Sequence, residues 1–361
     1  MQLVDFAAGE AQLAVAELAT RLLGAASYGS SPDGGYDAAT WKELASAGLL
    51  SLMLPASLGG DGLGLLDAAP VLTEAGRHAA RVPALATLAL GVLPVVRHGS
   101  AAAQEQLLAG VPTGETVLTA ALREPSDPMP ARPRATASAD GETVTGVKVG
   151  VPYAGVARWL LVPVSLATGQ PGLVAVAADA PGLQLQPTHS SSGQPEYTVR
   201  LDRTPVACRL GESPDAVADL YRLAIAGACC VADGALAAAL ALTTEHVRTR
   251  KQFGKPLATF QAVAQQIADV YITARTFHLA TLSACWRLDS GRDAGEDLDV
   301  AAYWLASQLP AALRSCHHLH GGLGMDVSYP LHRYSALITD LVTLVGGTEY
   351  RLDQLAAREG S

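Results

Sequence analysis

The amino-acid sequence predicts a mainly helical α+β protein in three parts: helices, then a small β domain, then a helical bundle. Two observations predict this order. Apolar residues recur at helical spacing from Phe6 to about Val117 and again from Ser213 onward. Between Thr116 and Leu210 the pattern changes to short runs rich in valine, leucine and threonine, separated by turn-forming residues. A chain of 361 residues is long enough for two or three packed units.

The first part, residues 1–116, is predicted to be an N-terminal helical domain. Three- and four-residue apolar spacing is typical of helices that bury one face. Asp37 is placed to cap the second of them, because its carboxylate can accept from the first free backbone N–H groups. A break rich in glycine and proline separates the second helix from the third. The predicted helices are Ala11–Leu23, Tyr36–Leu50, Leu65–Arg81 and Ala84–His98.

The second part, residues 117–212, is predicted to be a small β barrel or sheet. Its candidate strands are the runs TVLTAAL, ETVTGVKVGVP, RWLLVPV, GLVAVAA and EYTVRLDRTPV.

The third part, residues 213–361, is predicted to be a four-helix bundle, because four long helical patterns follow one another with short connections. Pro310 is expected to kink the third of these helices. The predicted helices are Ser213–Arg250, Phe260–Asp289, Leu298–His318 and Leu331–Leu344, with a short last one near Glu349–Arg358.

Charge and cysteine content exclude several classes of function. The formal charge is −9 and basic residues form no stripe, which argues against nucleic acid or an anionic membrane surface as a partner. The five cysteines are odd in number, sit in apolar stretches and lack metal-type spacing. We therefore expect buried, reduced thiols in a cytoplasmic protein and no metal site.

Two segments were considered as membrane or export signals. Met1–Glu10 lacks the basic start and apolar core of a signal peptide. Leu223–Leu242 is as long as a membrane span, but it is mostly alanine and carries Asp233 in its middle. We therefore predict a soluble protein in which this segment is a buried bundle helix.

Two segments of the third part carry residues suited to a ligand with a pyrophosphate. Arg250 ends a predicted long helix and Phe253-Gly254 opens a loop. A guanidinium there can hold pyrophosphate by forked, charge-assisted hydrogen bonds, and the aromatic ring can cover a ligand ring. Gly321-Gly322 ends the third bundle helix, where the lack of a Cβ allows close approach to the backbone. The same residues also suit ordinary helix ends.

Four segments along almost the whole chain resemble acyl-CoA dehydrogenases. Trp41–Gly64 is similar to the family's N-terminal segment ending in Pro-x-x-x-Gly-Gly, and the segment from Thr145 resembles its middle strand pair, with Lys148 in place. Arg248–Val270 is similar to the signature Arg-x-x-Phe-Gly…Phe-Gln…Ala-Asp. HLHGGLGMDVSYPLHRY, from His318, resembles Gly-Gly-x-Gly…Tyr-Pro…Arg-Tyr. The last two together are highly specific, and the resemblance implies that family's three-part fold.

The resemblance also implies FAD as cofactor, bound between two subunits. In the family one subunit holds the adenosine-pyrophosphate half of FAD, and the flavin ring lies in the neighbouring subunit. The implied reaction is the α,β-desaturation of an acyl-CoA thioester. The positions of this chain that match the nucleotide-binding motif are Arg250, Phe253, Phe260, Gln261, His318, Gly321 and Gly322.

The catalytic base of that reaction is missing from the matching positions. Removing a proton α to a thioester carbonyl requires a positioned carboxylate whose pKa is near neutral, which a desolvated glutamate provides. The family places it in one of two positions, and this chain has Gly346, followed by Gly347-Thr348, and Tyr221, followed by Arg222. A tyrosine, with an ordinary pKa of about 10, is a poor substitute. We therefore predict that this chain has no catalytic residue of its own.

The flavin-ring side departs from the family pattern as well. The segment Leu122–Pro130, LREPSDPMP, retains Glu124-Pro125 of the family's Thr-Glu-Pro and is shortened after it. The family's tryptophan and threonine beside the flavin ring fall at Gly150 and Pro152. Glycine has no ring to stack and proline no amide donor, so we expect a defective ring pocket in this chain.

This chain departs from the family on the flavin-ring and base side but retains the nucleotide side. In this it resembles the non-catalytic subunit of actinobacterial heterotetrameric acyl-CoA dehydrogenases, which shorten steroid side chains. Gly346-Gly347, the longer approach from Tyr329 and the HRY run at His332–Tyr334 favour that subgroup. The implied partner is a catalytic acyl-CoA dehydrogenase subunit in an α2β2 heterotetramer with half the usual number of flavins. The implied substrate is an acyl-CoA, a steroid side-chain ester of the β-oxidation that serves cholesterol catabolism.

Two other hypotheses stay open. The chain could be a self-sufficient homo-oligomeric dehydrogenase with a relocated base, for which Glu349 is the candidate because it shares a helical face with Gly346. A charge at that position also suits a helix N-terminus. Alternatively the chain could be a flavin-free structural subunit in which Arg250 and Gly321 are remnants. Visible flavin absorption separates the flavin-free hypothesis from the other two. The native mass of the assembly separates the heterotetramer from the self-sufficient homo-oligomer.

Overall fold

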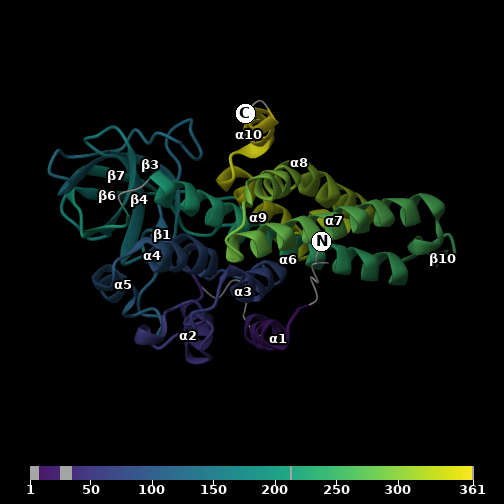
Figure 1. Ribbon diagram of the computed structural model, residues 1–361. Helices are drawn as coiled ribbons and strands as arrows, with labels where there is room; N and C mark the ends of the chain where they lie inside the picture. Colours follow the sequence, from purple (N-terminus) through teal and green to yellow (C-terminus); the bar gives the residue numbers. More distant parts are fainter. Residues whose placement is uncertain (1–7, 25–34, 212–213, 360–361) are drawn as a thin grey trace.

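The computed structural model describes residues 8–24, 35–211 and 214–359, and it confirms the predicted order of helices, sheet and helices (Figure 1). The β domain and the C-terminal bundle lie side by side, and the N-terminal helices run beneath both of them (Figure 1). A single apolar core of buried residues connects all three parts.

The N-terminal helices pack through apolar faces at the predicted spacing. Asp37 caps the second helix as expected, its Oδ1 accepting from the backbone N–H of Thr40 at 3.0 Å. The third helix ends earlier than predicted, at Arg77, where Ala79 turns to a φ of 44°. The sequence analysis missed the helix capped by Ser100. The elements are α1 (Glu10–Gly24), α2 (Ala38–Ser46), η1 (Ala56–Leu58), α3 (Leu65–Arg77), η2 (Leu85–Val92), α4 (Leu93–His98) and α5 (Ala101–Leu108).

The middle part is one mixed sheet, ordered β6-β7-β3-β2-β4-β5-β8, with β1 parallel to β4. Its inner strand β4 is buried along most of its length, as its unbroken apolar run predicts. The strands fall within the predicted 117–212 domain, but the second boundary, 212/213, lies outside the described residues. They are β1 (Leu118–Ala120), β2 (Thr136–Ala137), β3 (Thr143–Pro152), β4 (Trp159–Ser165), β5 (Pro171–Ala177), β6 (Leu183–Thr188), β7 (Glu196–Pro205) and β8 (Cys208–Arg209).

The C-terminal part is a bundle of long helices around α6, with a short last helix beside it. The third helix runs unbroken through Pro310. The elements are α6 (Pro214–Thr249), β9 (Lys251–Gln252), β10 (Lys255–Pro256), η3 (Leu257–Thr259), α7 (Gln261–Asp289), α8 (Gly295–His320), η4 (Gly321–Met325), α9 (Leu331–Leu344) and α10 (Gly347–Glu359).

Helix α6 is the core helix that the sequence analysis proposed in place of a membrane span. Its apolar stretch is long enough to cross a bilayer, but 78% of that stretch is buried inside the protein. Glycines on both helices allow α3 and α6 to approach closely: a Cβ on Gly76 of α3 would meet the carbonyl of Val231, and one on Gly234 of α6 would meet that of Thr73. Its apolar surface is therefore covered by protein, as in a soluble bundle.

The cysteines are free thiols, as expected, although not all of them are buried. Four lie in the core, and Cys230 and Cys285 approach to 3.6 Å between their sulfurs. Cys208 is only half-buried, because it lies at the sheet edge in the two-residue strand β8. Burial raises the pKa of Cys229, which makes it a poor nucleophile.

Carboxylates on bundle helices hold the three parts in place. Asp289, at the end of α7, accepts from the backbone N–H groups of Leu65 (3.0 Å) and Leu66 (2.5 Å) at the start of α3. Asp340 of α9 accepts from the N–H groups of Ser191 (2.7 Å) and Ser192 (2.8 Å) in the β domain. These contacts fix the bundle against both other parts and therefore fix the spaces between them.

Candidate functional site

The connection between α6 and α7 is a tight hairpin that carries four of the predicted cofactor residues. Arg250 follows α6 directly, and β9 pairs with β10 around a two-residue turn of Phe253 and Gly254. Both turn residues have positive φ, 51° and 79°, as a type I′ turn requires. Phe260 and Gln261 follow at the start of α7.

Phe253 occupies a strained position to present its ring outward. A bulky residue rarely adopts positive φ, and such outliers persist where the surroundings enforce them, often at ligand sites. The side chain is 92% exposed, and its ring meets that of Phe260 edge-on, with 6.2 Å between centroids. Lys255 lies over the ring of Phe260, its Nζ 4.4 Å from the centroid. The hairpin therefore offers a basic surface with one exposed aromatic ring, Phe253, and one partly exposed ring, Phe260.

The connection between α8 and α9 carries the remaining predicted residues. His318 is exposed on the last turn of α8, and Gly321 ends that helix at a φ of 58° and a ψ of −136°. A Cβ built on Gly321 or Gly322 meets no described atom within 4 Å. Packing inside the chain therefore does not explain Gly322, whereas the approach of a ligand or partner to this backbone would.

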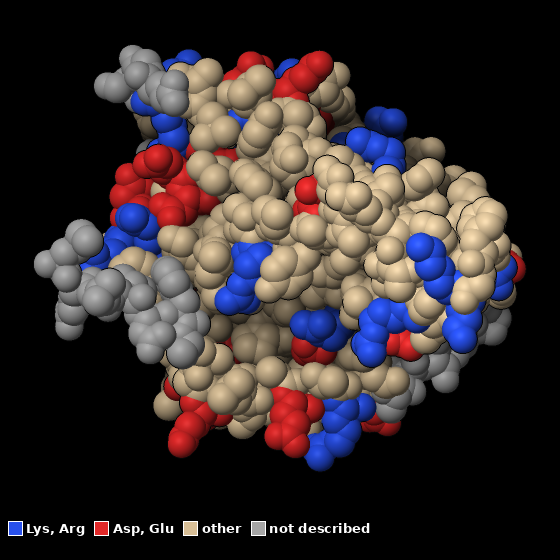
Figure 2. Space-filling model, turned by 90° about the vertical axis from the view of Figure 1, so that its right-hand side faces the viewer, with Lys and Arg blue, Asp and Glu red and all other residues tan. Residues whose placement is uncertain are grey.

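The two connections lie at the same end of the bundle, so the structure brings the predicted cofactor residues together. His246, one turn before Arg250, stacks on His320, the residue before Gly321, with ring centroids 4.4 Å apart. Figure 2 views this end of the molecule: much of its surface is uncharged, and both basic and acidic groups are scattered over it. The Arg250 side chain has no hydrogen-bond or ion-pair partner among the described residues, whereas its neighbour Arg248 pairs with Glu245 at 3.9 Å.

These features suit the adenosine-pyrophosphate half of FAD. An unpaired guanidinium can donate two forked hydrogen bonds to a pyrophosphate. Exposed aromatic rings can cover an adenine, and an open glycine loop lets phosphate approach backbone N–H groups. This end could therefore hold the nucleotide through Arg250, Phe253 and Gly321-Gly322, with His318 beside them.

The first base position is closed by the chain itself. Gly346 has a φ of 96°, and a Cβ built there would lie 2.5 Å from the ring of Tyr350 and 2.7 Å from Pro128. A carboxylate side chain at Gly346 therefore has no room. Tyr350 is held in this place by donating from its hydroxyl to the carbonyl of Met129 at 3.2 Å.

The second base position holds a phenol that cannot take up a proton. Tyr221 is buried, and its hydroxyl donates to the carbonyl of Pro130 at 3.1 Å. Burial raises the pKa of Tyr221 far above its ordinary value, and the carboxylates of Glu124 and Asp127 add to that shift. A group with so high a pKa stays protonated and is no general base near neutral pH.

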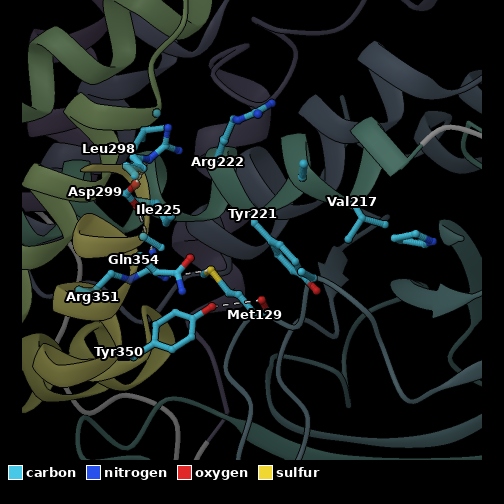
Figure 3. A pocket seen from close by; sticks show the side chains of 16 residues that line it. Met129, Val217, Tyr221, Arg222, Ile225, Leu298, Asp299, Tyr350, Arg351 and Gln354 are labelled. Atoms are coloured by element: carbon cyan, nitrogen blue, oxygen red, sulfur yellow. Dashed lines mark hydrogen bonds and ion pairs between the residues drawn. The ribbon is translucent and has the colours of Figure 1, made fainter. Parts of the chain in front are cut away.

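A pocket of about 440 Å³ lies beside these two tyrosines, and none of its described lining residues carries a free carboxylate (Figure 3). Figure 3 shows Tyr221 and Tyr350 on either side of Met129. Asp299 is the single acidic residue among its described lining residues, and it is paired with Arg351 at 3.7 Å and with Arg358. Sequence reasoning missed these α8 and α10 residues, because no local pattern reports a pairing between distant helices.

The positions that the resemblance assigns to the flavin-ring side, Gly150 and Pro152, offer little space in this chain. Gly150 has a φ of 64°, and a Cβ on it would collide with the guanidinium of Arg123. The space beside Pro152 is a cavity of only about 40 Å³, whereas ligand pockets measure about 300–1,000 Å³. Sequence reasoning predicted the loss of the tryptophan at Gly150 but did not foresee that Arg123 takes up its space.

Glu124, the carboxylate that remains on the ring side, is structural. It accepts from the ammonium of Lys148 at 2.7 Å and from the backbone N–H groups of Arg134 (2.7 Å) and Ala135 (3.0 Å). Burial alone would raise the pKa of Glu124, but these donors outweigh it and hold the pKa below its ordinary value. An ionised, fully paired carboxylate of this kind does not abstract protons.

Glu349, the relocated-base candidate, lies in the first turn of α10 with its side chain exposed. An exposed carboxylate is surrounded by water, which is the opposite of the desolvated site that α-proton abstraction requires. Its place suits an acidic residue at a helix N-terminus.

Comparison with known proteins decides the family. The family model for the acyl-CoA dehydrogenase N-terminal domain matches residues 11–115, and the one for the C-terminal domain matches residues 219–359. Over 324 residues the chain is 47% identical to acyl-CoA dehydrogenase FadE28 of Mycobacterium tuberculosis, covering 88% of this chain and 92% of that relative. The chain belongs to the acyl-CoA dehydrogenase family. Its cofactor is FAD, and the family's chemistry is the oxidation of a CH–CH bond.

Solved structures of two-chain acyl-CoA dehydrogenases (ACADs) resemble this acyl-CoA dehydrogenase over nearly its whole length. The Tcur3481–Tcur3483 steroid ACAD, solved in a variant form, has a TM-score of 0.92 and 35% identity, covering 98% of this chain and 99% of that chain. The ChsE4–ChsE5 complex from Mycobacterium tuberculosis has a TM-score of 0.92 and 29% identity, covering 99% of both chains. The predicted acyl-CoA dehydrogenase fold is therefore confirmed.

Proposed function

We propose that this chain is half of an FAD-dependent acyl-CoA dehydrogenase: it supplies the nucleotide half-site, and a catalytic partner chain supplies the ring pocket and the base. The observation that carries this proposal is the contrast between the chain's two half-sites. The end that bears Arg250 and Gly321 is open and has an unpaired cation. The positions of ring and base at Gly150, Tyr221 and Gly346 are filled by the chain's own atoms.

In the proposed assembly the residues of this chain bind or shield FAD, and none of them takes part in the reaction. Arg250 would hold the pyrophosphate, Phe253 and Phe260 would shield the adenine, and Gly321-Gly322 would let the phosphates approach the backbone. Gln261 and His318 flank that site. Bound FAD supplies the acceptor for the hydride that leaves the β-carbon of the acyl-CoA, while the proton goes to a carboxylate of the partner.

The exposed apolar residues at this end support a protein partner there. Phe253 is 92% exposed, Met325 81% and Val327 82%, and Leu323 lies beside them at 40%. Large apolar side chains that gather on one surface usually mark an interface. A partner covering this end would also close the nucleotide site from water.

We infer an α2β2 heterotetramer with one FAD per heterodimer, because only one of the two possible FAD sites of each pair would be complete. The resemblance to the two-chain ChsE4–ChsE5 and Tcur3481–Tcur3483 structures supports this assembly. The name of the latter, a steroid ACAD, supports a steroid side-chain CoA ester as the acyl-CoA substrate and a role in cholesterol catabolism. We place the assembly in the cytoplasm, where free thiols stay reduced.

The proposal is tested by expressing the chain alone and together with a catalytic acyl-CoA dehydrogenase chain encoded beside it. Alone, the protein should be colourless or poorly soluble and show no dehydrogenase activity, since half a cofactor site rarely retains its ligand through purification. Together, the two chains should give a yellow α2β2 particle with two FAD, measured by flavin absorbance and native mass. A yellow, active homo-oligomer would refute the proposal, and a heterotetramer that forms without bound flavin would favour the flavin-free structural role.

A further inference from the structure

The two segments of the proposed nucleotide site are joined by a stacked pair of histidines. His246 lies on the last turn of α6 and accepts, at its carbonyl, the backbone N–H of Arg250 at 2.8 Å. His320 is the last residue of α8, directly before Gly321. Their rings stack with 4.4 Å between centroids and 22° between planes. The position of Arg250 relative to the glycine loop is therefore set through these two rings.

His320 is also tied to the far end of the glycine loop. Its Nε2 lies 3.0 Å from the hydroxyl of Tyr329, so residues 321–328 form a loop closed at its base by this contact. Its Nδ1 lies 2.8 Å from the carbonyl oxygen of Cys316. A carbonyl can only accept, so Nδ1 carries a hydrogen. In the neutral imidazole this leaves Nε2 as the acceptor of the tyrosine hydroxyl, so the partners set the tautomer of the uncharged ring.

A second histidine of the same turn holds the middle of the loop. His317 Nδ1 lies 2.9 Å from the carbonyl of Gly324, and its Nε2 lies 2.7 Å from the hydroxyl of Ser335 in α9. The predicted cofactor residue His318 instead points outward and is exposed. The turn thus uses two histidines to hold the loop and leaves one free to face a ligand.

We propose that the stacked His246–His320 pair, tied to Tyr329, positions the glycine loop relative to Arg250, and that it does so only while both imidazoles are uncharged. The inference rests on the proposed FAD half-site. Two positive imidazolium rings at this separation would repel each other, and the neighbouring cation Arg250 adds to that repulsion. The proposed nucleotide site would therefore open on acidification, although neither histidine takes part in the reaction.

The surroundings favour the uncharged state at neutral pH. Burial, then His320 and Arg250, lower the pKa of His246. Burial lowers the pKa of His320, and His317 acts in the same direction, whereas the carbonyl of Cys316 opposes them. Tyr329 is the remaining titratable group against the pair, and burial raises its pKa, so it stays a neutral donor.

The expected pH dependence follows from the direction of these shifts. Because both pKa values lie below the ordinary value of about 6.5, the pair is neutral at pH 7 and above, and its contribution is lost as the pH falls through the two lowered pKa values. A bound pyrophosphate would act in the opposite sense by favouring positive charge on the pair. The loss of flavin from wild type on acidification is therefore compared with that from a variant that keeps the ring stack but has no protonatable ring at position 320.

The test measures flavin retention of the co-expressed heterotetramer by absorbance and by fluorescence of released FAD at pH 7.5 and 5.5, with native mass followed at each pH. His320→Ala removes the stack on His246 and the hydrogen bonds to Cys316 and Tyr329, so the FAD dissociation constant at pH 7.5 should rise about tenfold. His320→Phe keeps the stack, so its affinity at pH 7.5 should stay within about threefold of wild type and change less between the two pH values. His189→Phe, an exposed histidine in the loop after β6, should keep the wild-type pH response.

Two outcomes would overturn the inference: unchanged FAD affinity in His320→Ala at pH 7.5, or parallel loss of flavin on acidification in wild type and His320→Phe. If His320→Ala fails to fold, the comparison of His320→Phe with wild type still decides. Failure of the proposed half-site itself would look different, because Arg250→Ala would then leave flavin content unchanged. If Arg250→Ala removes flavin while both His320 variants behave as wild type, only the histidine inference fails.

Discussion

Replacing Arg250 by alanine separates a cofactor contact from an ordinary helix-end charge. In the described chain the guanidinium has no partner, so its removal breaks no internal hydrogen bond or ion pair and should leave the fold intact. Arg248, two residues earlier, is the matched control: it is also an exposed arginine at the end of α6, but it pairs with Glu245 at 3.9 Å.

The size of the effect follows from the contact that Arg250 is proposed to make. A hydrogen bond to a charged group contributes about 1.5–3 kcal/mol. At about 1.4 kcal/mol per factor of ten, that corresponds to a roughly 10- to 150-fold weaker binding of FAD. An exposed surface pair such as Arg248–Glu245 contributes about 0–1 kcal/mol, and it makes no proposed contact with the cofactor.

The assay uses the co-expressed heterotetramer, diluted and then passed through gel filtration, with the flavin-to-protein ratio read from absorbance. Arg250→Ala should lose most of its flavin under conditions where wild type and Arg248→Ala retain theirs, and added FAD should restore activity. Equal flavin retention by Arg250→Ala and wild type would refute the assignment. Equal loss of flavin in Arg250→Ala and Arg248→Ala would indicate a general effect of positive charge at this end of the bundle, without a specific contact from Arg250.

Three further predictions follow from the other positions. Glu349→Ala should change the rate of the assembled enzyme by less than about twofold, whereas a fall of several orders of magnitude in kcat would make Glu349 the base. Lys148→Met should lower the free energy of unfolding by about 3–5 kcal/mol in urea titrations, because it leaves Glu124 charged and buried without its partner; a loss below 1 kcal/mol would contradict this. Gly347→Ala should lower the free energy of unfolding by about 1–2 kcal/mol, because of its positive φ alone. Gly346→Ala should lower it by about 2–5 kcal/mol in the same measurement, because its Cβ also meets Tyr350. Equal losses would show that the packing around Gly346 is loose.

The sequence alone determined the order of the three parts and the residues at the proposed nucleotide end. Helical spacing and strand-like runs are local signals, which a single stretch of chain carries in full. The motif residues at that end share this property: Arg250 and Phe253 lie within one hairpin, and His318 and Gly321 within one helix end. The absence of a carboxylate at the two base positions could likewise be read from the sequence.

Only the tertiary structure decided what replaced the missing groups. Tyr350 meets Met129 across 221 residues, and Tyr221 meets Pro130 across 91. Whether a glycine such as Gly346 leaves an empty slot or a filled one depends on these distant partners. Because close packing is settled by shapes that meet only after the chain has folded, no periodicity or motif along the sequence reports it.

The stacking of His246 on His320 is likewise a contact that only folding reveals, since each residue alone is an ordinary histidine near a helix end. The sequence therefore identified which residues could bind FAD, and folding decided how those residues are held and which other sites are closed.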